Sequence, residues 1–89
     1  MIQFNRMVQF SLLVKAGGRL REFNFRKLRH PENEVFSVNV CDDRGDRLFF
    51  NLQKEDKDWH ISQNGLPPWI IQSEPGIQVA VEEELKNNW

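Results

Sequence analysis

Cysteine is almost absent from this sequence. Cys41 is the only one among 89 residues, which excludes a framework of internal disulfides. A small domain that folds without disulfides is typical of a reducing compartment, so we expect a cytoplasmic protein. No histidine lies near Cys41 in the sequence. We therefore interpret Cys41 as a half-buried strand residue and not as a nucleophile.

Long hydrophobic runs are also lacking. No apolar stretch approaches the roughly 20 residues that a membrane helix needs. The first six residues contain no basic region followed by a long apolar stretch, so we expect no secretory signal. The net charge is only −1, which gives no reason to expect an acidic membrane or a nucleic acid as partner. These absences predict a soluble protein with no membrane partner.

The residues that are present suit one small folded domain, spanning residues 1–89. Hydrophobic residues make up 39% and charged residues 28%, which is typical of a folded soluble protein. A chain of this length buries roughly 60–65% of the surface that its unfolded form exposes. Seven Phe and three Trp supply much of the core that this requires.

Apolar and polar residues alternate along the first segment, as they do in a half-buried strand. The apolar residues that share one parity are Ile2, Phe4, Val8, Phe10, Leu12 and Val14. The pattern predicts one long strand, or two short strands with a break at Arg6. Gly17 and Gly18 follow directly and predict a turn.

The clearest pattern is a hairpin between residues 35–41 and 47–53. Even-numbered residues in both segments are apolar and are predicted to face the core. The polar connection between them contains Gly45, which can supply the positive φ that the turn needs. Trp59 and Ile61 predict a short fifth strand with the same inward face.

The segment 19–29 is ambiguous, because it carries apolar residues on both faces. Phe23 and Phe25 share one face, and Leu20 and Leu28 share the other. A regular strand cannot bury both pairs, so we expect a bulge, a ragged end or contacts on two sides. The sequence leaves open which face is buried.

The sheet is predicted to end at Asn64-Gly65 and Pro67-Pro68. Ser73 is placed to cap a helix whose apolar stripe consists of Ile77, Ala80, Val81 and Leu85. Ile77, Val79 and Val81 also alternate as in a strand, but the run 82–84 of three glutamates favours a helix. We therefore predict an α+β fold: an antiparallel meander of four to five strands with one C-terminal helix packed on one face.

Residues for catalysis or metal binding are sparse. His30 and His60 are the only conventional bases, and no partner residues complete a triad around either. Asp58 and His60 share a strand face, but a stable metal site needs three or four ligands. The sequence therefore predicts no enzyme, no metal site and no cofactor.

One segment stands above this background, because residues 19–29 interleave cations with aromatic rings. The candidate binding residues are Arg19, Arg21, Phe23, Phe25, Arg26, Lys27 and Arg29. On a sheet, such cations can contact phosphates while the rings stack on the bases of a single-stranded nucleic acid. The competing interpretation, which we favour because the chain is not basic overall, places Phe in the core and Arg at an edge.

Charge is divided unevenly along the chain. Residues 1–30 hold seven basic residues against one acid, a net charge of +6, and residues 31–89 carry −7. The two parts can pair between two copies or neutralise one another within one chain. The sheet face opposite the helix, with Phe49 and one apolar pair of segment 19–29, is expected to be partly uncovered. We therefore expect a non-catalytic interaction module that binds a protein partner or its own copy as a homodimer, with single-stranded nucleic acid as the alternative ligand.

Overall fold

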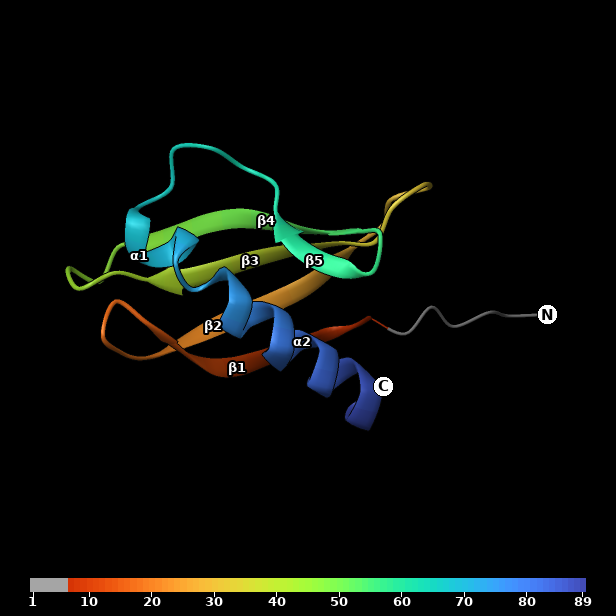
Figure 1. Ribbon diagram of the computed structural model, residues 1–89, viewed down its shortest axis with the longest axis horizontal. Helices are drawn as coiled ribbons and strands as arrows, with labels where there is room; N and C mark the ends of the chain where they lie inside the picture. The colour runs from red at the N-terminus through yellow and green to blue at the C-terminus, as the bar shows by residue number, and fades with distance from the viewer. Residues whose placement is uncertain (1–6) are drawn as a thin grey trace.

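The computed structural model describes residues 7–89, and Figure 1 shows their arrangement. Five strands form one antiparallel sheet in the order in which they occur in the chain. The strands are β1 (Gln9–Ala16), β2 (Arg19–Leu28), β3 (Val35–Cys41), β4 (Arg47–Glu55) and β5 (Asp58–Ile61). The sheet curls into a half-barrel, and the C-terminal helix contacts β1 and β5. The predicted α+β meander is confirmed.

The first strand begins at Gln9, and its even-numbered side chains face the core as the alternation predicts. Ile2, Phe4 and the suggested break at Arg6 lie outside the described residues. Gly17 and Gly18 connect β1 to β2 with φ angles of 64° and 83°. Two consecutive positive φ angles are what the tightest hairpin turns require, and glycine adopts them without steric cost.

The hairpin of β3 and β4 is confirmed in register and orientation. Phe36 pairs with Leu52, and Val38 pairs with Phe50. These four side chains are buried. In the turn, the Asp42 carboxylate accepts hydrogen bonds from the backbone N–H groups of Arg44 and Asp46, both at 2.9 Å.

The structure answers which face of β2 is buried. Phe23 and Phe25 point into the core with exposed fractions of 0% and 2%, whereas Leu20 is 64% exposed on the opposite face. The pairing of β2 with β1 and with β3 proceeds without a shift in register, so the strand contains no bulge. Leu20 is exposed because no element covers that face of the sheet.

The C-terminal helix is α2 (Glu74–Asn88), and the alternative strand is wrong. Ile77 and Val81 are buried, while Val79 is exposed. Ser73 stands at the predicted N-cap position but does not cap the helix with its side chain. Its hydroxyl instead donates a 2.6 Å hydrogen bond to the Ile70 carbonyl, because Ser73 continues the turn that precedes α2.

A second, short helix, α1 (Pro68–Ile71), precedes α2 and was not predicted. Pro68 stands in its first turn, where the missing N–H is not needed. Ile70 is fully buried, so α1 adds an apolar side chain to one end of the core. Four residues are too few to show helical periodicity in the sequence.

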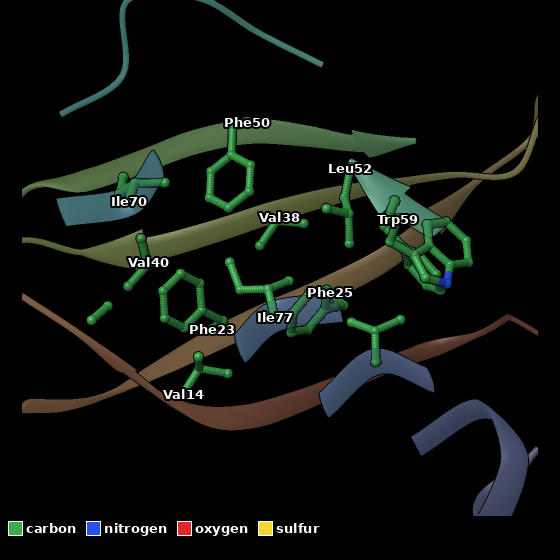
Figure 2. Packing of buried hydrophobic residues seen from close by; sticks show 13 residues of the cluster. Val14, Phe23, Phe25, Val38, Val40, Phe50, Leu52, Trp59, Ile70 and Ile77 are labelled. Carbon is green, nitrogen blue, oxygen red and sulfur yellow. The ribbon is translucent and has the colours of Figure 1, made fainter. Parts of the chain in front are cut away.

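The core lies between the concave face of the sheet and the two helices. Figure 2 shows Phe23, Phe25, Phe50 and Trp59 from three different strands directed into the same space, together with Ile77 from α2. Phe36 contacts Trp59 with ring centroids 5.1 Å apart. The face of the sheet that is turned away from α2 carries no helix, and we call it the outer face (Figure 1). Within residues 7–89, no helix is long and apolar enough to cross a membrane.

Candidate functional site

The two aromatic residues of the candidate binding segment do not form a binding surface. Phe23 and Phe25 are part of the core, packed edge to face against Phe50 and Phe36 respectively. Their rings are covered, so neither can stack on a base. The stacking arrangement considered for segment 19–29 is therefore not available in this fold. The alternative, with Phe in the core, describes these two residues.

Arg21 is the least expected residue of the segment, because its side chain is only 6% exposed. Its Nε donates a 2.8 Å hydrogen bond to the Ala16 carbonyl, and its Nη2 lies 3.0 Å from the Asp43 carboxylate. The guanidinium also stacks over the ring of Trp69, 4.3 Å from the centroid. Arg21 therefore holds β1, the β3–β4 turn and α1 together, and it is not placed to bind a phosphate.

Two more of the candidate cations pair with acids of the same chain. Arg19 lies 2.7 Å from Asp43, and Lys27 lies 3.3 Å from Glu34. In each case a residue of the basic first third meets an acid of the remainder. The structure therefore shows intramolecular neutralisation, one of the two arrangements that the charge division allowed.

The remaining two candidate cations, Arg26 and Arg29, are exposed at the far end of β2. Together with Lys27 they line a groove of about 830 Å³. The apolar part of the groove comes from Met7, Val8, Leu28 and Pro31. Arg19 and Arg21 lie toward the opposite end of the ten-residue strand, five to ten residues away along the chain, which is roughly 17–33 Å at about 3.3 Å per residue. The structure thus divides the seven candidate residues among the core and two distant ends.

Sequence reasoning missed a row of polar side chains that crosses the outer face. The Ser11 hydroxyl donates to the Asn24 side chain, and Asn24 Nδ2 donates to Asn39 Oδ1 at 2.9 Å. Arg47 Nη1 donates to the same Asn39 oxygen at 2.6 Å. We call these four residues, on β1 to β4, the polar row. The alternation in the sequence shows that each of these residues lies on the outward side of its strand. Whether they lie next to one another depends on the register between the strands, which the sequence does not show.

Exposed apolar side chains flank the polar row. Leu13 on β1 and Leu20 on β2 are each 64% exposed, and their positions are diagonal neighbours in the register. Phe49 on β4 is 59% exposed and pairs with Asn39 of the polar row. The outer face therefore mixes apolar and hydrogen-bonding groups. Such a mixture is typical of surfaces that bind a protein reversibly.

The two edges of the sheet differ. At β5, side chains of α2 cover the outward backbone groups: Glu74 Oε2 accepts a 2.8 Å hydrogen bond from the Ile61 N–H. Gln78 Nε2 donates a 2.6 Å hydrogen bond to the Trp59 carbonyl. One outward backbone group of Trp59 and one of Ile61 are thus already bonded, so a further strand would have to displace both side chains, which is a way to protect an edge.

At β1 the corresponding groups are open. The Lys27 N–H donates to the Val8 carbonyl at 2.9 Å, so even-numbered residues of β1 bond to β2. The backbone groups of Gln9, Ser11, Leu13 and Lys15 consequently point away from the sheet. Within residues 7–89, no hydrogen bond reaches these backbone groups. We call these four residues the open edge.

Side chains that bind metal ions do not gather in the described part of the chain. Residues 7–89 contain no group of three or more His, Cys, Asp or Glu that could hold a metal ion. His60 approaches only Glu74, with Nδ1 3.8 Å from the nearer carboxylate oxygen. The surfaces that offer groups to a partner are the outer face, the open edge and the groove with Arg26 and Arg29.

No protein-family model, no curated protein and no solved structure matches this chain.

Proposed function

We propose that the protein is a non-catalytic interaction module that binds a protein partner or its own copy through the outer face of its sheet. The observation that carries the proposal is the uncovered state of that face. Leu13, Leu20 and Phe49 each expose more than half of their surface beside the polar row. Apolar groups of this kind gain free energy when a partner removes them from water, and the polar row can fix the partner's orientation.

The compartment that we propose is a reducing cytoplasm. Cys41 is unpaired and half-buried in β3, and the fold needs no disulfide to close its core. A domain of this kind keeps its structure where thiols stay reduced.

The proposal is tested by introducing lysine at apolar residues that have similar exposed fractions but lie on different surfaces. Leu20→Lys and Phe49→Lys alter the outer face, whereas Val79→Lys alters a residue that is 57% exposed on the solvent side of α2. We expect the first two variants to weaken association by roughly 1–3 kcal/mol, and the third to leave it unchanged. Association is measured by sedimentation of the purified protein, and by quantitative capture of each partner that the wild type retains. Equal behaviour of all three variants would contradict the proposal.

Single-stranded nucleic acid is the second candidate ligand, and what supports it is the groove with Arg26 and Arg29. If these two cations contact phosphates, affinity falls with salt at a slope of about −0.7 per contact. Arg26→Ala and Arg29→Ala should each lower that slope, whereas Arg19→Ala, at the other end of β2, should not. Absence of oligonucleotide binding by the wild type at low salt would rule this candidate out.

A further inference from the structure

The strongest unused feature of the molecule is the open edge of β1. Four backbone N–H groups and four C=O groups, those of Gln9, Ser11, Leu13 and Lys15, point along one line toward solvent. Strand β1 is eight residues long and contains no proline. An uninterrupted edge of this length is a template for one more strand, and adding a strand to an edge is a recognised way to bind extended peptides.

The concave side of the same strand is covered only in part, because α2 contacts β1 and the ring of Trp89 lies 6.3 Å from that of Phe10. Phe10 and Leu12 are only half-buried, whereas Phe25 and Phe23, which pair with them on β2, are covered. The difference follows from position, because β1 has a strand on one side only. A strand placed beside β1 would set its own side chains next to Phe10 and Leu12. Apolar residues at alternate positions of that strand would complete the core face.

The outer side of β1 favours an acidic residue on a strand added beside it. Lys15 is exposed on the outer face beside the open edge, and within residues 7–89 no acid lies within ion-pair distance of it. Opposite charges on directly paired strand residues are favourable by about 0.2–1 kcal/mol. An acidic residue on the outer side of the added strand, opposite Lys15, therefore fits this edge.

A second copy of the chain fits the edge less well than a peptide does. Antiparallel pairing of β1 with β1 leaves both copies' helices on the same face of the joined sheet. In Figure 1 the C-terminal half of α2 already extends past β1 on the side away from β2. Two copies would bring two such helices over the same pair of strands. An extended segment without a helix of its own meets only the single α2 of this chain.

We propose that β1 binds an extended peptide segment of a partner protein as a sixth strand of the sheet. The segment alternates apolar residues, which lie beside Phe10 and Leu12, with polar residues on the outer side. One of the polar residues is acidic and lies opposite Lys15. This inference rests on the proposed function, because it names the kind of partner that the module takes and the strand that takes it.

The test is an NMR titration of the full chain with a synthetic peptide that alternates valine and threonine and carries one glutamate on the threonine side. We expect the amide protons of Gln9, Ser11, Leu13 and Lys15 to exchange about tenfold more slowly once about nine-tenths of the protein is bound, since exchange then occurs only from the free fraction. The amides of Phe10 and Leu12 already bond to β2 and should change little. A peptide of the same composition in scrambled order is the control.

Two variants separate the edge from the outer face. Leu13→Pro removes an N–H of the open edge without removing a bond to β2, and it should abolish peptide binding. Leu20→Lys changes an equally exposed leucine on the neighbouring strand and should leave peptide binding intact. Lys15→Glu should weaken binding of the peptide that carries glutamate. The same variant should bind a peptide with lysine at that position about as well as the wild type binds the glutamate peptide. This charge exchange provides an independent check if Leu13→Pro does not fold.

The outcomes distinguish this inference from the proposed function. Equal protection by the scrambled peptide, or amide changes confined to Leu20 and Phe49, would overturn the added strand while leaving the outer face as a binding surface. Protection of the open edge that grows with protein concentration, without peptide, would make a second copy the occupant and also overturn it. Absence of peptide binding overturns the inference. If the outer-face variants also leave association unchanged, the proposed function fails as well.

Discussion

At the scale of single residues, Phe49 and Phe50 show how one step along a strand reverses a side chain's environment. Phe50 points into the core and pairs with Val38, while Phe49 is 59% exposed on the outer face. Phe50→Ala should lower the free energy of unfolding by about 3–5 kcal/mol, because it leaves a cavity among packed rings. Phe49→Ala should change it by about 0.5 kcal/mol or less. Urea unfolding of both variants measures the two changes in the free energy of unfolding. Equal decreases would contradict the inward orientation of Phe50 and the outward orientation of Phe49.

Arg21 and Arg19 form a second matched pair, because both contact the same Asp43 carboxylate. The Arg21 side chain is buried and also bonds to the Ala16 carbonyl, whereas the Arg19 side chain is 61% exposed. Arg21→Ala should therefore lower the free energy of unfolding by about 1.5–3 kcal/mol, as expected for hydrogen bonds of a charged group.

Arg19→Ala should lower it by at most about 1 kcal/mol, since exposed ion pairs contribute little. Thermal unfolding of the two variants under identical conditions gives the comparison. A loss at Arg19 as large as that at Arg21 would show that the ion pair with Asp43, and not burial against Trp69, determines the contribution of Arg21.

At the scale of elements, the sequence was sufficient wherever a period was long enough to be read. The hairpin of β3 and β4 follows from a period of 2 in both strands. For α2 the apolar residues fitted a strand as well as a helix, and the helix propensity of the glutamates at 82–84 decided between them. Four-residue α1 shows no period, so it was missed. The burial of Arg21 was missed for a related reason: an arginine on the inward face of a strand is tolerated only because Trp69 and Asp43, distant in sequence, meet it there.

The polar row is a part of the candidate site that the sequence could not predict. Ser11, Asn24 and Asn39 each occupy the outward parity of their strand, which the sequence shows. That they align into one hydrogen-bonded row depends on the offset between strands, which turn lengths and core packing determine together. Segment 19–29 stood out by composition, but composition does not reveal which of its cations already have acids nearby.

The edge at β5 gives a prediction for α2. Glu74→Ala removes the acceptor of the Ile61 N–H, so exchange of this amide should accelerate selectively. The free energy of unfolding should fall by about 1 kcal/mol, the usual contribution of one hydrogen bond. Glu74→Gln retains an oxygen acceptor and should keep most of the protection. Glu82→Ala, on the exposed side of α2, is the control, and acceleration of Ile61 exchange in that variant as well would point to general loosening of the helix.

At the scale of the whole molecule, the division of charge is resolved in part inside one chain. Arg19, Arg21 and Lys27 from the basic first third meet Asp43 and Glu34 from the acidic remainder. Long-range attraction between opposite halves of two copies therefore has less charge to act on. Besides the exposed cations Lys15, Arg26 and Arg29, the molecule offers a partner apolar side chains and backbone hydrogen-bonding groups.

This arrangement predicts how association responds to salt. The mass of the protein in solution, measured by sedimentation at fixed concentration, should be the same at low and at high ionic strength. Attraction between opposite halves of two copies would behave otherwise, because the screening length shortens from about 10 Å at 0.1 M to about 3 Å at 1 M salt. Dissociation on adding salt would show that ion pairs between copies hold the assembly together.

The difference between the two edges of the sheet limits how many folded copies can join edge to edge. A fibre of sheets needs two free edges on every unit, one to receive a strand and one to offer it. Here Glu74 and Gln78 bond to the Ile61 N–H and the Trp59 carbonyl of β5 and stand in the way of a further strand, so each folded copy offers a free edge only at β1. Once two folded copies have joined through β1, neither has a free edge left for a third copy. One free edge per copy therefore limits edge-to-edge assembly of folded copies to pairs and does not allow an open-ended fibre.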